Sequence, residues 1–579
     1  MLSQCMRLTA LRKMARPTML RTVSVAWPLQ SVKMSAMPDV VREKSSVSFH
    51  QSQVDYQPHS DTIKMEEVIP DFDDSQATFE SKSTKALLRA TLVYTLCRIQ
   101  PIVDNSEPLL KLTRRVLGNK ITDAILKVTL YGHFCAGEDE RRLQPVIEEL
   151  RRNGIGGILD YAAESDIEPT PQNLQPVPGF IQPARVYDYE SEAACDHHVE
   201  VFRSCIRSVA NVSPDGFAAI KVTALGNPKL LERMSIAITE SKNLFAKFDE
   251  NGNGFISREE FEKGYRHYFN DADERLPELF EILDPEDTGL VDYITWSKLL
   301  TPHDLPLITK SCRETGPLME ATPNEEEVEL IEKMHARAHA LAEEAFQCGT
   351  RLLIDAEHFR FQPAIDNLVL ELQQTYNATD KSEIPIIFNT YQCYLKDNME
   401  RLVLDVERSE RFNYHFACKL VRGAYMESER RRAEKKGYPS PIHDTIEDTH
   451  KSYDDAVAYL IQHSVNTEDK QVELMCATHN QASIEKAIAV MHECGIDRAA
   501  PTLHFAQLYG MSDNLTYNLG KSGFRAYKYV PYGKVSEVMP YLMRRAQENS
   551  AMMGNATGEL AMLRSELFRR MRKTIGMSS

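Results

Sequence analysis

Eight short apolar runs, separated by stretches with helical periodicity, constrain the fold of this chain more than any other feature. The runs cover residues 155–159, 217–225, 352–354, 384–388, 416–421, 472–477, 502–505 and 524–530. Helical patterns lie between most of them, at 325–346, 364–376, 396–412, 449–463 and 481–494. Repeated strand–helix units predict a parallel sheet, and eight of them predict an α/β fold closed into a (β/α)8, TIM-like barrel. An open doubly wound sheet is the alternative, but no Gly-x-Gly-x-x-Gly motif follows the first run.

The predicted barrel, residues 154–554, is preceded by segments of different composition. Residues 1–38 contain six lysines and arginines and no acidic residue, which is typical of a mitochondrial transit peptide; a disordered basic tail is the alternative. Residues 39–83 are polar and aperiodic, which predicts a linker or disordered arm. Residues 84–153 have helical periodicity and predict a helical arm, and residues 555–579 form a C-terminal tail.

Composition narrows the class of partner and the compartment. The formal net charge of −16 argues against a nucleic-acid partner, because phosphate binding requires a basic surface. The eleven cysteines include no Cys-x-x-Cys pair, so they fit neither a disulfide framework nor a zinc site and suit a reducing compartment such as the mitochondrial matrix. The most apolar helical stretch, 86–99, is interrupted by Arg89 and Arg98 and is too short to cross a bilayer. We therefore expect any membrane contact to be peripheral.

An insertion interrupts the regular spacing after the second run. About 100 residues separate that run from residue 325, whereas a strand–helix unit needs roughly 30. Part of the insertion matches a calcium-binding loop, with Gly254 at its sharp turn and oxygen ligands at Asp249, Asn251, Asn253, Phe255 (through its carbonyl), Ser257 and Glu260. A second loop begins at Asp284 but has Thr295 in place of the final glutamate, so we expect it to be structural. The sequence predicts an EF-hand-like insert at 230–300 that binds calcium weakly, with a packing-only loop as the alternative.

Two oppositely charged residues fall at the ends of neighbouring predicted strands. If Ala218, Ile220 and Val222 face the helices, then Lys221 faces the lumen of the barrel, and the same alternation places Asp355 there. We expect the two side chains to pair, because an unpaired buried charge costs several kcal/mol. A structural ion pair and a catalytic role fit this pattern equally well.

The closing stretch, 527–549, predicts a strand, a turn and a helix with two different faces. One face repeats apolar residues at helical spacing, namely Val535, Val538, Met539, Leu542 and Ala546. The other carries Tyr541, Arg544, Arg545 and Glu548, and its adjacent guanidinium groups suit a small anion. A solvated charged face is the alternative interpretation.

Five motifs together resemble the proline dehydrogenase family, the flavin-dependent enzymes of proline catabolism. They are Ile-Lys-Val-Thr-Ala-Leu at 220–225, Ile-Asp-Ala-Glu at 354–357, Leu-Val-Arg-Gly-Ala-Tyr at 420–425, Ala-Thr-His-Asn at 477–480 and Tyr-Leu-Met-Arg-Arg-Ala-Gln-Glu-Asn at 541–549. The resemblance covers roughly residues 84–554 and is greatest to the animal mitochondrial form. It implies oxidation of L-proline to 1-pyrroline-5-carboxylate by hydride transfer to FAD, with electrons passed to a quinone at the inner membrane of the mitochondrion.

The resemblance also implies roles for individual residues. Arg544, Arg545 and Lys221 would hold the substrate carboxylate, and Asp355 would fix the lysine. Tyr425, Tyr529 and Tyr541 would enclose the ring, and Glu164 would pair with the first arginine as a gate. The implied FAD contacts are Asn389, Lys419, Arg422, Gly423, Ala424, Thr478, His479, Asn480 and Glu548.

Two departures from the bacterial members and two alternatives accompany this resemblance. Lys419 stands where those members carry arginine next to the flavin, and His504 replaces an acidic residue, so we expect a packed histidine there. One alternative is a hydroxyproline dehydrogenase, although that branch has a smaller residue in place of Tyr529. The other is a calcium-binding scaffold with an inactive barrel. The basic tail 564–573, with Leu567 and Phe568, is a weak candidate for membrane contact.

Overall fold

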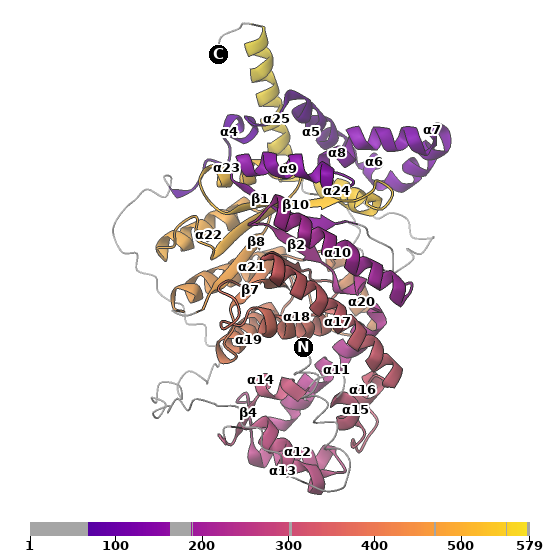
Figure 1. Cartoon of the computed structure of the whole chain (residues 1–579), viewed down its shortest axis with the longest axis vertical. Helices are drawn as coiled ribbons and strands as arrows, with labels where there is room; N and C mark the ends of the chain where they lie inside the picture. Colours follow the sequence, from indigo (N-terminus) through magenta and orange to yellow (C-terminus); the bar gives the residue numbers. More distant parts are fainter. Residues whose placement is uncertain are drawn as a thin grey trace. The chain divides into compact units, whose positions relative to one another are not determined.

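In the computed structural model (Figure 1), eight parallel strands close into a barrel. The structure describes residues 68–162, 187, 189–285, 287–299, 304–467, 470–551 and 553–575. The predicted transit peptide, 1–38, and Glu164 lie outside these residues. The strands are β1 (Ile155–Tyr161), β2 (Phe217–Ile220), β5 (Arg351–Ile354), β6 (Ile387–Gln392), β7 (Phe416–Val421), β8 (Val472–Ala477), β9 (Leu503–Leu508) and β10 (Ala526–Tyr532). Their order around the barrel is β1-β10-β9-β8-β7-β6-β5-β2, which confirms the predicted barrel and excludes the open sheet.

Alternation along the strands separates a lumen core from a helix-facing core. Phe217, Ala219 and Leu353 pack with other apolar side chains in the lumen, while Ala218 and Ile220 pack against the surrounding helices. The helices that follow the strands are α10 (Glu192–Val212), α11 (Pro228–Phe248), α17 (Glu325–Cys348), α18 (Gln362–Tyr376), α19 (Asn398–Arg411), α20 (Met426–Lys436), α21 (Ile446–Val465), α22 (Gln481–Glu493), α23 (Asp513–Lys521) and α24 (Met539–Ala551). Because all eight strands are parallel, their carboxyl ends meet on one face, where active sites of such barrels lie.

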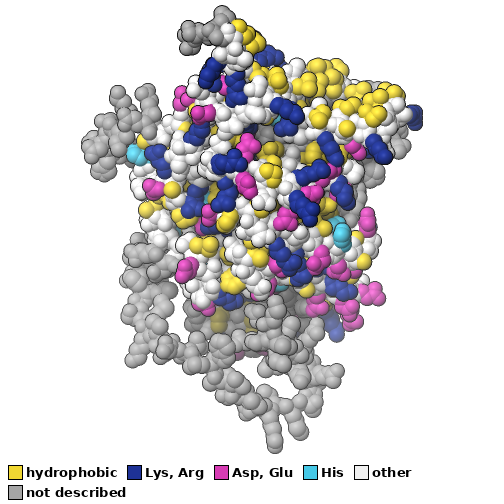
Figure 2. Space-filling model, turned by 45° about the horizontal axis from the view of Figure 1, so that its top comes forward, with side chains coloured by type: hydrophobic (Ala, Val, Ile, Leu, Met, Phe, Trp, Pro, Cys, Tyr) yellow, Lys and Arg dark blue, Asp and Glu magenta, His cyan; other side chains and the backbone are white. Residues whose placement is uncertain are grey.

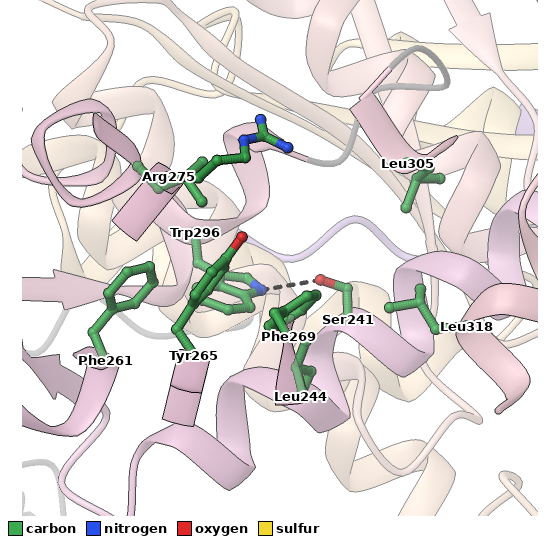
Figure 3. Close-up of a pocket in the computed structure, with 10 residues that line it drawn as sticks. Ser241, Leu244, Phe261, Tyr265, Phe269, Arg275, Trp296, Leu305 and Leu318 are labelled. Carbon is green, nitrogen blue, oxygen red and sulfur yellow. Dashed lines mark hydrogen bonds between the residues drawn. The ribbon is translucent and has the colours of Figure 1, made fainter. Parts of the chain in front are cut away.

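The insertion between α11 and α17 has its own apolar core. It contains β3 (Phe255–Ser257), α12 (Arg258–Tyr268), α13 (Ala272–Leu283), β4 (Leu290–Asp292), α14 (Tyr293–Trp296), α15 (Asp304–Thr309) and α16 (Pro317–Ala321). Strands β3 and β4 pair antiparallel and join two helix–loop–helix units through the buried pair Ile256 and Val291. An apolar cavity of about 40 Å³ lies between Tyr265, Trp296 and Leu318 (Figure 3), where Trp296 Nε1 donates to Ser241 Oγ at 3.0 Å. This volume holds only a few water molecules, so the cavity is a packing feature of the insertion.

Helices at both ends of the chain cover the barrel beside α24. They are α4 (Ser75–Phe79), α5 (Thr84–Cys97), α6 (Gln100–Asp104), α7 (Ser106–Val128), α8 (Leu130–Phe134), α9 (Glu140–Arg152) and α25 (Met553–Thr574). The part of 39–83 that the structure describes differs from the predicted linker, because it contains α4 and buries Phe72 and Phe79. Arg570 of α25 donates to the carbonyl oxygens of Phe79 and Lys82, so the tail is attached to this layer. None of the described helices is long and apolar enough to span a bilayer.

Candidate active site

One buried carboxylate organises the charged groups at the carboxyl ends of the strands. Asp355 follows β5, and its neighbour in the parallel register, Lys221, follows β2. Lys221 Nζ lies 3.3 Å from Asp355 Oδ2, Lys419 Nζ of β7 lies 2.5 Å from Asp355 Oδ1, and the Tyr529 hydroxyl of β10 donates to Oδ2 at 3.1 Å. The structure therefore has the predicted Lys221–Asp355 pair, and it adds a second lysine and a tyrosine. We call Lys221, Asp355, Lys419 and Tyr529 the Asp355 cluster.

The carboxylate of the Asp355 cluster is held in its charged form. Burial alone would raise the pKa of Asp355, but Lys419 and Lys221 outweigh it and lower the pKa to about 2. The carboxylate is therefore ionised at neutral pH, and it fixes the ends of both lysine side chains.

Helix α24 adds two guanidinium groups to this face. Its apolar stripe, including Met539 and Leu542, packs in one core cluster with Val93 of α5 and Phe134 of α8. This packing fixes the opposite face, on which Arg544 and Arg545 are both buried, and their Cζ atoms lie 5.9 and 4.9 Å from the centre of the Tyr541 ring.

Glu548 is the carboxylate partner of this arginine pair. Its Oε1 accepts from Arg545 Nη2 at 2.5 Å, one turn earlier on α24. The family resemblance implied that this glutamate contacts FAD. In the structure its hydrogen-bond partner is Arg545.

Two buried donors on α24 have no hydrogen-bond partner in the part of the chain that the structure describes. They are the Tyr541 hydroxyl and Arg545 Nε. Burial raises the pKa of the Tyr541 hydroxyl far above its usual value, so it stays protonated. A buried donor that makes no hydrogen bond costs about 1–3 kcal/mol, so these two groups suit a ligand that accepts hydrogen bonds.

A second polar cluster lies around the amino end of α22. Arg422, which follows β7, donates to His450 Nδ1 at 2.9 Å, Thr478 Oγ1 at 2.7 Å and Ser483 Oγ at 2.9 Å. Asn480 caps α22 by accepting from Ser483 N at 3.1 Å. A helix amino terminus beside a fixed guanidinium group has the donors and the charge that bind phosphate.

The chain next to Arg422 leaves little space on one side. Gly423 has φ = +135°, and a Cβ atom on it would lie 2.5 Å from the ring of Tyr394. Only glycine fits this position without displacing Tyr394. Ala424 is exposed beyond it, and the buried ring of Tyr425 lies 4.2 Å from that of His358, whose Nδ1 lies 2.9 Å from Glu429 Oε1.

His479 is a neutral buried side chain next to these groups. Its Nδ1 lies 2.8 Å from Ser512 Oγ. Burial, together with the positive charges of Lys528 and Arg545, lowers the pKa of His479 to about 3. The imidazole is therefore uncharged at neutral pH.

Two residues, Asn389 and His504, lie at other places in their strands than the sequence predicted. The run predicted to end at residue 388 continues as β6 to Gln392, so Asn389 lies within the strand and its Nδ2 donates to Asp366 of α18 at 3.0 Å, on the outer face. The run predicted to end at 505 continues as β9 to Leu508, so His504 is the second residue of the strand and not its end. His504 is fully buried and its Nε2 lies 3.1 Å from Glu473, which is the packed histidine that the sequence favoured.

Sequence reasoning missed two buried carboxyl groups at this face. Asp160 lies near the end of β1, and its charge contributes to a raised pKa of Tyr529 after burial itself. Glu357 is fully buried and accepts hydrogen bonds from Thr223 N at 3.0 Å and Thr223 Oγ1 at 2.6 Å. Both lie on the lumen side by the same alternation that identified Lys221 and Asp355, so this signal was present in the sequence.

Hydrogen bonds from its own side chains fix the shape of the first loop of the insertion, residues 249–260. Asp249 Oδ2 accepts from Gly254 N at 2.8 Å, and Asn253 Oδ1 accepts from Phe255 N at 2.8 Å. Glu260 accepts from Asn251 Nδ2 at 2.8 Å and from Ser257 Oγ at 2.7 Å. Among the described residues, no three His, Cys, Asp or Glu side chains are arranged to hold a metal ion. At its ligand positions this loop offers only two carboxylates.

Comparisons with known proteins agree on one family. A family model described as proline dehydrogenase matches residues 239–557. Mitochondrial proline dehydrogenase 1 of Homo sapiens is 35% identical over 552 residues, which cover 87% of this chain and 90% of the relative. A hydroxyproline dehydrogenase of Xenopus laevis is 27% identical, covering 85% of this chain and 89% of the relative.

A solved structure has the same fold. Proline utilization A (PutA) from Bdellovibrio bacteriovorus, inactivated by N-propargylglycine, matches with a TM-score of 0.50 at 16% sequence identity. The match covers 84% of this chain and 40% of the PutA chain. At this identity the likeness concerns the barrel and its helices.

Proposed function

This chain belongs to the proline dehydrogenase family, and from that premise we propose how its barrel binds and orients L-proline. It is an FAD-dependent enzyme that oxidises L-proline to 1-pyrroline-5-carboxylate. One observation carries the assignment of its site: two buried donors on α24, the Tyr541 hydroxyl and Arg545 Nε, make no hydrogen bond within the described residues. They lie beside the guanidinium groups of Arg544 and Arg545, and an amino acid carboxylate supplies acceptor oxygens for such donors.

Arg544, Arg545 and Lys221 bind the carboxylate of proline in this proposal. Glu548 fixes the guanidinium of Arg545, and Asp355 fixes the ammonium of Lys221. Because the ends of these long side chains are fixed before the substrate arrives, substrate binding loses less conformational entropy. Tyr425, Tyr529 and Tyr541 are the walls that enclose the pyrrolidine ring and exclude water. Glu164 as a gate stays a prediction.

The residues around α22 fit a cofactor that contains phosphate. Bound FAD supplies the acceptor for the hydride that leaves the proline ring. Arg422 and the amino end of α22, with Thr478 and Asn480, are the groups we assign to its pyrophosphate, because they offer fixed donors and positive charge. Gly423, Ala424, Lys419, His479 and Glu548 are the further contacts that we assign to the cofactor.

The substrate amine must lose a proton before oxidation, and this site needs no dedicated base for that step. Lys221, Lys419, Arg544 and Arg545 surround the proposed position of proline with positive charge. Nearby cations lower the pKa of an amine, so the proton passes to water as proline enters. Asp355 has its pKa lowered to about 2 and serves to hold the lysines.

Replacement of Arg545 tests the carboxylate site. We expect Arg545→Met to raise the KM for proline about 10- to 100-fold, because a hydrogen bond to a charged group contributes about 1.5–3 kcal/mol. Arg411→Met, which changes an arginine on the outer surface of α19, is the matched control and should leave the KM unchanged. Bleaching of the flavin absorbance by proline establishes the activity itself. A KM that moves by less than about twofold would remove Arg545 from the proposed carboxylate site.

Proline is the preferred substrate over hydroxyproline in this proposal. The Tyr529 hydroxyl donates to Asp355 and fills space where a hydroxylated ring would need room. Steady-state comparison should give a higher kcat/KM for L-proline than for hydroxyproline. The reverse order would favour the hydroxyproline dehydrogenase alternative.

A calcium ion bound by the first loop of the insertion is a second part of the proposal. The loop has Gly254 with φ = +86° at its sharp turn and the ligand order Asp249, Asn251, Asn253, Phe255, Ser257 and Glu260. Two carboxylates predict weak binding, because affinity rises with ligand charge. Calorimetric titration of the whole protein with Ca²⁺ should give heat that Glu260→Gln abolishes. The absence of heat in the unaltered protein would make this a packing loop.

The mitochondrion is the proposed location, on the matrix side of the inner membrane, with a quinone as electron acceptor. The human relative is named mitochondrial, and residues 1–38 have the composition of a transit peptide. Expression of a fluorescent fusion should place the full chain in mitochondria and a chain lacking residues 1–38 in the cytosol. Mitochondrial location of the shortened chain would contradict the role of this segment.

A further inference from the structure

Exposed apolar side chains are concentrated in one short segment. Among the described residues, 21 large apolar side chains are exposed, and eleven of these lie between residues 88 and 128. Figure 2 shows hydrophobic side chains gathered at the upper right, the end where Figure 1 places α7. A surface of this kind on a protein marks a site of contact with another protein or a membrane.

Helix α7 forms the centre of this surface as a bent pair of arms. The helix breaks at Gly118, which has φ = 77° and ψ = 163°, and Arg114 of the first arm lies 3.3 Å from Asp123 of the second. Leu112 and Val116 on the first arm, and Ile121 and Ile125 on the second, are each one turn apart, so each arm has an apolar stripe. We call these four residues the α7 apolar face.

Charge around the α7 apolar face selects the kind of partner. Residues 84–128 contain eight lysines and arginines and three acidic residues, although the whole chain has a net charge of −16. Lys111, Arg115 and Lys120 are exposed beside the apolar stripes. A second copy of this chain would bring the same positive charge against itself, and residues 1–38 also carry only positive charge. An anionic lipid surface complements both the apolar side chains and the basic ones, whose long stems reach up to the headgroups.

This segment also lies beside the active site. Helices α5, α6 and α8 contact α24, the helix that carries Arg544 and Arg545. Val93 and Phe134 pack with Leu542 in one apolar cluster, and Ser550 Oγ of α24 donates to Gln100 Oε1 of α6 at 2.7 Å. One layer of helices therefore separates the α7 apolar face from the guanidinium groups.

We propose that the α7 apolar face docks on an anionic bilayer, with α7 lying in the interface between headgroups and acyl chains. Apolar stripes rimmed by lysine and arginine are the features of helices that bind in this plane. Docking here holds the carboxyl-end face of the barrel near the membrane, where a lipid-soluble quinone is available. This last consequence rests on the proposed oxidation of proline, whereas the docking itself does not.

Vesicle binding tests the docking directly. The full chain should sediment with vesicles of phosphatidylcholine and phosphatidylglycerol, and less with phosphatidylcholine alone. Val116→Glu with Ile121→Glu should reduce the bound fraction about tenfold or more, because a charged side chain does not enter the acyl region. The matched control is Ile446→Glu with Val465→Glu on α21, because these side chains are 64% and 52% exposed and Val116 and Ile121 are 70% and 55% exposed. The control should bind as the unaltered protein does.

Enzyme assays separate this proposal from the proposed function. With a water-soluble dye as acceptor, the Val116→Glu, Ile121→Glu variant should oxidise proline at the unaltered rate. With a quinone embedded in the vesicles, its rate should fall together with its binding. If proline bleaches no flavin in the unaltered protein, the proposed function fails while the vesicle result still stands. Equal vesicle binding by variant and control would overturn the docking proposal. It would also be overturned if the unaltered protein bound no vesicles and light scattering showed a dimer that the variant lacks, because the α7 apolar face would then contact a second copy of the chain.

Discussion

The barrel contains two buried charged clusters, one at each end of its lumen, and they differ in the groups that lie beside them. At the carboxyl ends, Asp355 pairs with both Lys221 and Lys419, and the buried guanidinium groups of Arg544 and Arg545 lie on the same face. Towards the amino ends, Arg351 donates to Glu473 through Nε and Nη2, both at 2.9 Å, and His504 lies 3.1 Å from the same carboxylate. We call Arg351, Glu473 and His504 the Glu473 cluster. Burial lowers the pKa of His504, so it is neutral, and the charges of Arg351 and Glu473 cancel.

The comparison shows what distinguishes a binding site from a structural ion pair in the same barrel. The Glu473 cluster pairs its own charges and is enclosed by the rings of Phe217 and Tyr527, although His504 Nδ1 has no hydrogen-bond partner among the described residues. The Asp355 cluster lies beside Arg544 and Arg545, and two buried donors of α24 have no partner among the described residues. In barrels of this kind the amino-end face contributes to stability and the carboxyl-end face to chemistry. The buried guanidinium groups at one end give a physical reason for that division here.

The largest expected effect is on stability at the amino-end cluster. Glu473→Gln leaves the buried guanidinium of Arg351 without its counter-charge, which costs about 3–5 kcal/mol in the free energy of unfolding. Chemical denaturation measures the loss, and the KM for proline of the folded variant should stay unchanged. Glu400→Gln is the matched control, because Glu400 pairs with Lys242 on the surface and contributes less than about 1 kcal/mol. A raised KM in Glu473→Gln would show that the two clusters are not separable.

Glu357, a buried glutamate at the carboxyl-end face, should make the free energy of unfolding fall as the pH rises. Burial raises the pKa of Glu357 from 4.5 to about 7, although the Thr223 hydrogen bonds lower it in part. The folded chain therefore holds this proton more tightly than the unfolded chain. The stabilisation is complete below pH 4.5 and is lost as the pH rises to about 7, by an amount on the order of 3 kcal/mol.

Glu357→Gln tests this dependence because it cannot titrate. Denaturation of both proteins at a series of pH values from about 4.5 to 7 should give a free-energy difference that changes steadily with pH. Thr113→Ala on α7, which removes a hydroxyl that donates only to the carbonyl oxygen of Leu109 at 2.7 Å, is a control that should shift stability equally across this pH range. A constant difference for Glu357→Gln would mean that the carboxyl titrates normally.

Sequence patterns identified the Lys221–Asp355 pair because its position depends on two simple periodicities. Alternation placed Lys221 and Asp355 in the lumen, and the parallel register that pairs Ile220 with Ile354 makes the following residues neighbours. The expected strand ends at residues 388 and 505 were wrong, which changes the places of Asn389 and His504 in their strands. Strands β6 and β9 extend beyond the apolar runs through polar residues, and the added residues changed which positions lie at the end.

The apolar side chains of α7 illustrate a different limit. Leu112 and Val116 have the spacing of a stripe that faces a core, and their exposure follows only from the packing of the rest of the chain. The partner of Glu548 was also undetermined, because residues three and four positions earlier on a helix are both within reach. Local pattern gives the face of an element, and tertiary packing decides what meets that face.

A smaller effect is expected from neutralising the carboxylate of the Asp355 cluster. Asp355→Asn removes the charge that holds the ends of Lys221 and Lys419, so both lysines repel each other and lose their fixed positions. We expect kcat/KM for proline to fall about tenfold, because loss of one hydrogen bond to a charged group costs about 1.5 kcal/mol or more. Asp455→Asn on the surface of α21 is the control. Unchanged kcat/KM would mean that the lysines need no partner to bind the substrate.

The smallest expected effect compares two tyrosines on one strand. Tyr529 and Tyr527 both lie on β10 and both face the lumen, but Tyr529 donates to Asp355 while Tyr527 packs against Phe217 and His504, with ring centres 5.2 and 5.4 Å apart. Tyr529→Phe removes a hydrogen bond to a carboxylate and should lower kcat/KM for proline by about twofold to tenfold. Tyr527→Phe removes the corresponding hydroxyl next to the Glu473 cluster. It should leave kcat/KM unchanged and alter only the free energy of unfolding, by less than about 1.5 kcal/mol. Equal kinetic effects of the two substitutions would contradict the division of the lumen into a binding end and a structural end, because the two residues differ only in the cluster that they contact.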